Sequence, residues 1–245
     1  MKVAAIIQAR MGSTRLPGKV LKKVLDKTLL EYQIERVKRA KTIDEIIIAT
    51  TTKESDDPIV QLCQQLSIPY YRGSEEDVLS RYYEAATTFG VDVIVRLTSD
   101  CPIIDPMVID KVVEQYLDNR DRYDYVSNTL TRTYPRGMDT EVVSYEVLKR
   151  AHEEAKGSVY REHVTAYMYH HPDQFRLCNV SNEEDESKHR WTVDTEEDFE
   201  LIEKIISKLY PENTYFNMDD VLKLIDRNPA WFDINSHVEQ KKLFE

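Results

Sequence analysis

The chain has 245 residues and a formal net charge of −11 at pH 7. This length suits one large α/β domain with an ample core, and the acidic balance argues against nucleic acid as the main partner. Its three cysteines are scattered and form no disulfide or zinc pattern, and no apolar run is long enough for a signal peptide or a membrane span. We therefore expect a cytoplasmic protein with no nucleic-acid or membrane partner.

The first predicted element is a buried strand over residues 3–8, which runs directly into the loop QARMGSTRLPGK at 8–19. Glycines in such a loop let the backbone approach a bulky anion, and successive N–H groups surround it. Arginine pairs with phosphate oxygens through two parallel hydrogen bonds, and lysine adds a point charge. The loop therefore predicts a polyphosphate site whose contacts are Ala9, Arg10, Gly12, Ser13, Arg15 and Lys19.

Two familiar phosphate loops do not match this segment. A P-loop needs four residues between its first glycine and the Gly-Lys pair, then Ser or Thr. Here five residues separate Gly12 from Gly18, and Val20 follows the lysine. The dinucleotide fingerprint G-x-G-x-x-G is also absent. A basic surface loop that binds nothing is the simplest alternative, but three like charges in one tight loop repel one another.

Strands and helices then alternate through the first half of the chain. We predict helices at 28–41, 58–66, 76–89 and 106–119 and strands at 45–51, 69–72, 92–97 and 124–128. Such alternation is typical of βαβ units and a parallel sheet, in which ligands bind beyond the carboxyl ends of the strands. The polar segments 8–19, 51–57 and 98–101 all follow predicted strands, so we expect them at one edge of the sheet.

The alternation stops after residue 128. A turn-rich stretch at 129–141 precedes helical patterns at 144–155 and 159–170, a strand at 175–180 and an acidic loop at 182–188. Within a single domain spanning 1–245, we interpret 129–188 as an inserted lobe for the second substrate and for dimer contact. The sheet pattern resumes at 189–194, and helices at 196–209 and 218–226 close the fold.

Two aspartates are candidate magnesium ligands. Asp100 ends a strand just before the turn at Pro102, and Asp194 precedes a predicted helix. Magnesium takes few protein carboxylates and fills its other positions with water and phosphate. Either aspartate alone is more simply interpreted as a helix cap. Thr195, however, with Asp198 three residues later, already forms a capping pair for the last long helix, which leaves Asp194 free for a metal.

The loop A-R-x-x-S-x-R-L-P-G-K at 9–19 resembles that of the nucleotidyltransferases that make CMP-activated acidic sugars. Examples are the CMP-3-deoxy-octulosonate and CMP-sialate synthetases, and the match is best with the spore-coat polysaccharide cytidylyltransferase-homologue family. In these enzymes one aspartate in a G-D-x-P loop and another in a V-D-T-x-E-D motif hold the metal. Asp100 and Asp194 match these positions, whereas Ser99 stands where the family usually has glycine. That departure puts turnover in doubt more than binding.

The resemblance implies a Rossmann-like, glycosyltransferase-A-like α/β fold with a mixed, mainly parallel sheet flanked by helices. It implies transfer of CMP from CTP to an ulosonic acid, with Mg²⁺ as cofactor and release of pyrophosphate, in surface or spore-coat polysaccharide synthesis by a homodimer. The sugar's anomeric hydroxyl attacks the α-phosphate, so no covalent enzyme intermediate is needed. The implied catalytic residues are Arg10, Arg15, Lys19 and Asp100.

Weaker signals lie elsewhere in the chain. We assign nucleotide contacts to Thr51, Arg72, Ser74 and Thr98, although Ser74 is also a good helix cap with Asp77 as its partner. We assign sugar contacts to Arg136, Asp139, Glu141, Arg161 and His163. The segment 134–141 is otherwise a solvated connector, and the histidines are otherwise surface or interface groups.

Two other functions remain open at this stage. A sugar-1-phosphate nucleotidyltransferase needs a second phosphate site, for which Arg132 and Arg136 are available. A catalytically degenerate nucleotide-binding subunit is favoured only by Ser99. The joint presence of the three loop cations and both aspartates argues against that third possibility.

Overall fold

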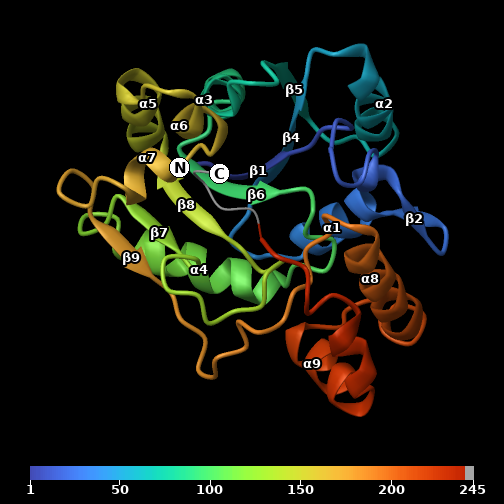
Figure 1. Ribbon diagram of the computed structural model, residues 1–245. Helices are drawn as coiled ribbons and strands as arrows, with labels where there is room; N and C mark the ends of the chain where they lie inside the picture. The colour runs from blue at the N-terminus through green and yellow to red at the C-terminus, as the bar shows by residue number, and fades with distance from the viewer. Residues whose placement is uncertain (241–245) are drawn as a thin grey trace.

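The computed structural model describes residues 1–240 and is organised around a seven-stranded sheet with the strand order β5-β4-β1-β6-β8-β7-β9 (Figure 1). Strands β5, β4, β1 and β6 are mutually parallel, and β8 runs antiparallel to both of its neighbours, β6 and β7. The seven strands are β1 Val3–Gln8, β4 Glu45–Thr51, β5 Tyr70–Gly73, β6 Val93–Thr98, β7 Tyr125–Ser127, β8 Glu141–Ser144 and β9 Leu177–Asn179. The predicted mixed, mainly parallel sheet is confirmed.

Helices cover both faces of this sheet, which explains the continuous apolar runs in its central strands. One face packs against α1 (Leu29–Val37), α2 (Asp57–Gln65) and α4 (Pro106–Asp118). The other packs against α3 (Val78–Thr88), α5 (Tyr145–Glu154) and α7 (Ala166–Tyr169), with the short α6 (Ser158–Glu162) beside them. A two-stranded ribbon, β2 (Lys23–Val24) and β3 (Lys27–Thr28), precedes α1.

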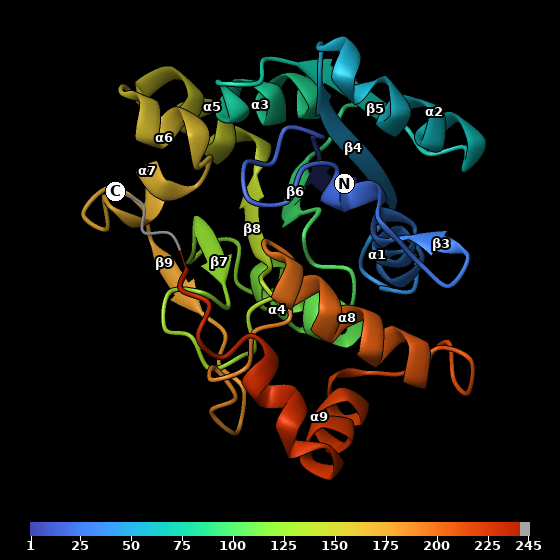
Figure 2. The ribbon, with the colours of Figure 1, turned by 45° about the vertical axis from the view of Figure 1, so that its right-hand side comes forward.

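A third apolar cluster lies beside the sheet, where the last two helices pack against α1 and α4 (Figure 2). It joins α8 (Glu196–Leu209) and α9 (Met218–Arg227) around the fully buried Trp191. The predicted cap of α8 is confirmed: Thr195 and Asp198 form a capping box. Because this cap fixes the start of α8, it also fixes the position of Asp194 immediately before it.

Two predicted helix boundaries are wrong. Helix α1 ends at Val37, because the backbone N–H groups of Lys41 and Thr42 turn to the Asp110 carboxylate, 3.0 and 2.9 Å away. Helix α3 begins at Val78 and is capped by Asp77, whose carboxylate accepts from the backbone of Ser80.

The single helix predicted over 159–170 is also wrong, since the segment is broken into α6 and α7. The break occurs at Val164, which has a φ of +49°. A left-handed conformation cannot continue a right-handed helix, and it is unusual for a β-branched residue.

The sequence pattern indicated a lobe at 129–188 that is set apart from the sheet. In the structure this segment is part of the sheet. Strand β8 lies between β6 and β7, and β9 extends the same sheet beyond β7. The turn-rich interpretation of 129–141 missed β8 because only its last residue, Glu141, belongs to the strand. The assignment of 129–188 to sugar recognition and dimer contact stays a prediction.

Candidate active site

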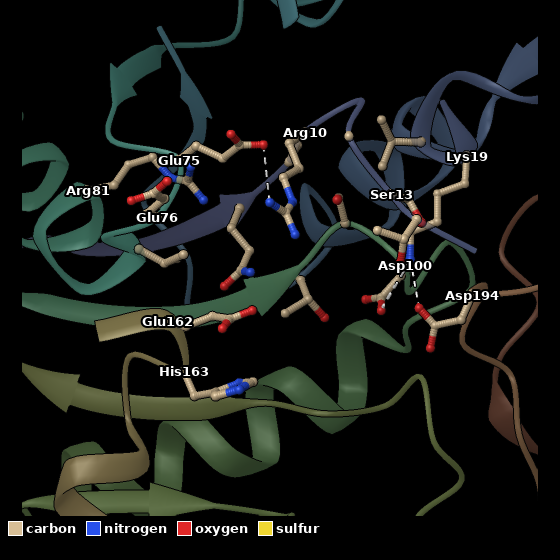
Figure 3. A pocket seen from close by; sticks show the side chains of 18 of the residues that line it. Arg10, Ser13, Lys19, Glu75, Glu76, Arg81, Asp100, Glu162, His163 and Asp194 are labelled. Atoms are coloured by element: carbon tan, nitrogen blue, oxygen red, sulfur yellow. Dashed lines mark hydrogen bonds and ion pairs between the residues drawn. The ribbon is translucent and has the colours of Figure 1, made fainter. Parts of the chain in front are cut away.

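A pocket of about 720 Å³ opens at the carboxyl ends of β1 and β6 (Figure 3). This is the edge at which ligands bind in open α/β sheets. Ten of the predicted site residues line it: Ala9, Arg10, Gly12, Ser13, Arg15, Lys19, Thr98, Asp100, His163 and Asp194. The structure therefore brings the predicted phosphate loop and both predicted metal ligands to one cavity.

The loop after β1 is folded tightly on its own backbone. The Met11 carbonyl accepts hydrogen bonds from the N–H groups of Ser13 and Gly18, at 2.9 and 3.0 Å. The Met11 N–H in turn donates to the carboxylate of Asp56, at 2.7 Å. Gly18 has a φ of +69°, a conformation that glycine adopts without strain. These contacts hold Arg10, Arg15 and Lys19 around one cavity although they are spread over ten residues.

Asp100 and Asp194 meet at the Lys19 ammonium. Lys19 Nζ lies 2.7 Å from Asp194 Oδ1 and 3.8 Å from Asp100 Oδ2. The two acidic segments are joined directly, because the Val193 N–H donates to the Asp100 carbonyl at 2.8 Å. The Thr192 hydroxyl donates to the same carbonyl at 3.2 Å. Residues far apart in the sequence are thus held at one point.

Asp194 is surrounded by cations. Besides Lys19, Arg15 Nη2 and Arg190 Nη2 each lie 2.9 Å from its second oxygen, Oδ2. Burial alone would raise the pKa of Asp194, but these three cations outweigh burial and hold the pKa below its ordinary value. Arg190 is itself held by the fully buried Asp198 at 2.8 Å. Sequence reasoning missed Arg190, which no motif singles out.

The donor set at this point suits magnesium. Among residues 1–240, no group of three or more His, Cys, Asp or Glu side chains is arranged to hold a metal. Two carboxylates at the rim of an open cavity are nevertheless typical of a magnesium site that is completed by water and phosphate. Because the Lys19 ammonium lies between the two carboxylates, it has to move aside when a metal binds them.

Residues 4–243 match the family model for cytidylyltransferases. The chain belongs to the cytidylyltransferase family. It is therefore a nucleotidyltransferase. No helix within the described residues is long and apolar enough to cross a membrane.

Relatives of this cytidylyltransferase extend over its whole length. It is 41% identical to an uncharacterized protein of Methanocaldococcus jannaschii, over 100% of this chain and 99% of that protein. It is 36% identical to the spore coat polysaccharide biosynthesis protein SpsF of Bacillus subtilis, over 91% and 94%. A 3-deoxy-manno-octulosonate cytidylyltransferase of Chlamydia trachomatis is 32% identical over 57% of this chain and 55% of the relative.

Two solved structures show the same fold. A cytidylyltransferase from Leptospira borgpetersenii superposes with a TM-score of 0.91 at 35% identity, covering 99% of both chains. CMP:2-keto-3-deoxy-manno-octonic acid synthetase, solved in complex with CTP, superposes with a TM-score of 0.64 at 17% identity. That match covers 85% of this chain and 99% of the synthetase. At 17% identity, the match to the synthetase shows a shared fold and nothing more.

Three predicted nucleotide contacts of the cytidylyltransferase do not line the pocket. Thr51 is fully buried and donates to Asp56. Arg72 donates to the carbonyls of Thr51 and Lys53, both at 2.8 Å. The Ser74 hydroxyl accepts from the backbone of Asp77 at 3.0 Å. These side chains brace the loops behind the pocket, and their assignment as nucleotide contacts stays a prediction.

Four predicted sugar contacts also lie outside the pocket lining: Arg136, Asp139, Glu141 and Arg161. The Asp139 carboxylate is paired with Arg132 at 2.5 and 2.7 Å. Arg161 is paired with Asp77 at 2.7 Å. These partners occupy the groups that were predicted to read the sugar, so only His163 of that set stands at the cavity.

The backbone of Arg136 serves the fold. Its N–H donates to the His189 carbonyl at 3.0 Å, and its carbonyl accepts from the Trp191 N–H at 2.7 Å. The polar groups that line the pocket instead, and that the sequence did not single out, include Gln8, Glu75, Arg81, Arg96 and Glu162.

Proposed function

We propose that this enzyme transfers CMP from CTP to an acidic keto-sugar, an ulosonic acid, and releases pyrophosphate, with Mg²⁺ as cofactor. The observation that carries the proposal is the meeting of Asp100 and Asp194 at Lys19, beneath a loop that also holds Arg10 and Arg15. Nucleotidyl transfer needs this combination, because three phosphates must be held and charge must be neutralised at the one that is attacked.

Each group then has a defined part. Arg10, Arg15 and Lys19 bind the β- and γ-phosphates and stabilise the pyrophosphate that leaves. Asp100 and Asp194 would hold Mg²⁺, which would supply charge neutralisation at the phosphate oxygens. The anomeric hydroxyl of the sugar attacks the α-phosphate in line.

The relatives support the substrate class and the pathway. One relative is named for spore coat polysaccharide biosynthesis and another as a 3-deoxy-manno-octulosonate cytidylyltransferase, and a structural neighbour was solved with CTP. We extend these properties to this chain: CTP as donor, an ulosonic acid as acceptor and a cell-surface or spore-coat polysaccharide as destination. We further expect a homodimer, which light scattering after size-exclusion chromatography tests.

A pyrophosphate-release screen tests the proposal. The four nucleoside triphosphates are combined with a panel of ulosonic acids and, as a second arm, with sugar 1-phosphates. We expect release with CTP and an ulosonic acid, dependent on Mg²⁺. Release with sugar 1-phosphates alone would replace the proposed acceptor, and release with another nucleotide alone would replace CTP.

A further inference from the structure

The pocket contains a second cationic centre that neither the motifs nor the metal site explain. Arg96 of β6 lines the pocket, and Glu141 of β8 is its direct partner in the register of the two strands. Arg96 Nη1 donates to Glu141 Oε2. Only the arginine of this pair lines the cavity.

Glu141 is held from three sides. Its carboxylate accepts from the hydroxyls of Tyr125 and Thr165 as well as from Arg96. The residue is only 7% exposed. Burying a carboxylate costs free energy unless it is paired with a cation and hydrogen-bonded. Arg96 and the two hydroxyls meet both conditions for Glu141. Glu141 therefore fixes the guanidinium of Arg96 and does not itself reach a substrate.

Arg96 keeps hydrogen-bonding capacity in reserve. A guanidinium has five N–H donors. One goes to Glu141, and Nη2 donates to Gln8 Oε1 at 3.1 Å. Its Nε is buried without a hydrogen-bond partner among the described residues, so the donors left for a ligand are the remaining N–H groups of Nη1 and Nη2. Gln8 also lines the pocket, so its amide adds a donor beside the arginine.

The break between α6 and α7 serves the same place. Val164 adopts a φ of +49°, a strained conformation for a β-branched residue. On one side of it His163 lines the pocket, and on the other Thr165 donates to Glu141 at 2.6 Å. Local strain of this kind clusters at functional sites, where it places groups that a regular helix does not.

This centre lies apart from the metal ligands. Figure 3 shows Glu162 and His163 on one side of the pocket and Lys19, Asp100 and Asp194 on the other. Asp100 is four positions after Arg96 in the chain, so their Cα atoms lie at most about 13 Å apart. Arg96 and Asp100 line the same pocket, so an acceptor that is bound in this pocket faces both centres.

We propose that Arg96, with Gln8 and His163, forms the subsite that binds the carboxylate of the acceptor sugar. The inference rests on the proposed function and gives the acidic acceptor its recognition group. An arginine fork binds a planar carboxylate through two parallel hydrogen bonds, and lysine does not reproduce that geometry. Specificity for an acidic sugar then depends on β6 and β8 and not on the segment around Arg136.

The test compares an ulosonic acid that supports pyrophosphate release with its primary amide, which lacks the negative charge. For the wild-type enzyme we expect a roughly ten- to hundredfold preference for the acid in kcat/KM. Two variants are measured, Arg96→Lys and the double variant Arg96→Met with Glu141→Gln. The double variant leaves no buried charge unpaired, so it protects the test against a loss of folding.

In both variants we expect the preference for the acid to collapse through a raised KM, while the Kd for CTP stays within about twofold of wild type. The matched control is Arg176→Met with Asp124→Asn. That pair also joins an arginine and a carboxylate next to neighbouring strands, but it lies outside the pocket. We expect it to keep the preference.

Two outcomes overturn the inference in distinguishable ways. An unchanged acid-to-amide ratio in both variants, with CTP binding intact, overturns the subsite alone. Failure of every ulosonic acid to accept CMP in the wild-type enzyme overturns the proposed function and the subsite with it.

Discussion

The two ends of the pocket are built in different ways. At the nucleotide end, one short loop supplies Arg10, Arg15 and Lys19, and Asp100 after β6 and Asp194 before α8 meet Lys19. At the acceptor end, Arg96, Glu141 and His163 come from a parallel strand, an antiparallel strand and a strained turn. The loop of the first end is a local arrangement, whereas Arg96 and Glu141 of the second meet only once the sheet has formed.

This difference has a physical consequence. In the proposed function, the groups at the nucleotide end serve phosphate chemistry that is common to nucleotidyltransferases. At the acceptor end an arginine is fixed by a buried carboxylate, so its position depends on register and packing. We therefore expect changes at the nucleotide end to affect catalysis and CTP binding with every acceptor, and changes at the acceptor end to affect the choice of acceptor.

The largest effect expected at the nucleotide end is that of Asp100→Asn. Removing a group that neutralises charge on the attacked phosphate should lower kcat roughly a hundred- to thousandfold, equally for every acceptor. The melting temperature should stay near that of wild type, because this carboxylate is partly exposed at the pocket. Asp118→Asn, on an exposed turn of α4, is the control. Equal activity of the two variants would remove Asp100 from the mechanism.

A smaller effect is expected from weakening the support of Asp194. Asp198→Asn takes a charge from the fully buried partner of Arg190 and should lower the free energy of unfolding by on the order of 3 kcal/mol. Asp220 is the equivalent capping residue of α9, but among residues 1–240 it is not paired with a buried arginine. Asp220→Asn should therefore lower the free energy of unfolding by about 1 kcal/mol or less. Urea denaturation measures both. Similar losses would mean that Asp198 acts only as a helix cap.

The smallest of these effects concerns Lys19 in the absence of nucleotide. Its ammonium lies between the two carboxylates, so it competes with a divalent cation. Lys19→Met should raise the affinity of the nucleotide-free protein for Mn²⁺ about tenfold, as followed by the paramagnetic resonance of free Mn²⁺. Lys22→Met, which removes a lysine paired with Glu196 outside the pocket, is the control. Unchanged or weaker Mn²⁺ binding by Lys19→Met would place the metal elsewhere.

The sequence was sufficient for the parts of the molecule that local patterns determine. Strands β1 and β4 and helix α8 have the predicted bounds, because apolar runs and a capping box mark their ends. The loop at 9–19 could be recognised for the same reason, because its charged residues and glycines lie within one short segment. The meeting of Asp100 with Asp194 was expected from the resemblance to the CMP-sugar synthetases, whose two metal-binding aspartates they match.

The acceptor end could not be predicted from local sequence patterns. No local sequence pattern predicts that Glu141 begins a strand, or that this strand pairs with β6 so that Glu141 lies opposite Arg96. Arg136 has a side chain suited to binding a sugar, but its backbone N–H and C=O groups form hydrogen bonds with residues 189 and 191. The break at Val164, where φ is positive, interrupts a continuous helical pattern. Register and strain come from tertiary structure, and single-sequence patterns do not contain them.

The central claim is that the loop after β1 binds the triphosphate of CTP, and calorimetric titration of Arg15→Ala tests it most directly. The Arg15 side chain faces Asp194 at 2.9 Å on the cavity wall, and its loss removes charge-assisted hydrogen bonds to phosphate. We expect the Kd for CTP with Mg²⁺ to rise roughly ten- to hundredfold while the Kd for cytidine is unchanged. Equal weakening of CTP and cytidine would contradict the account.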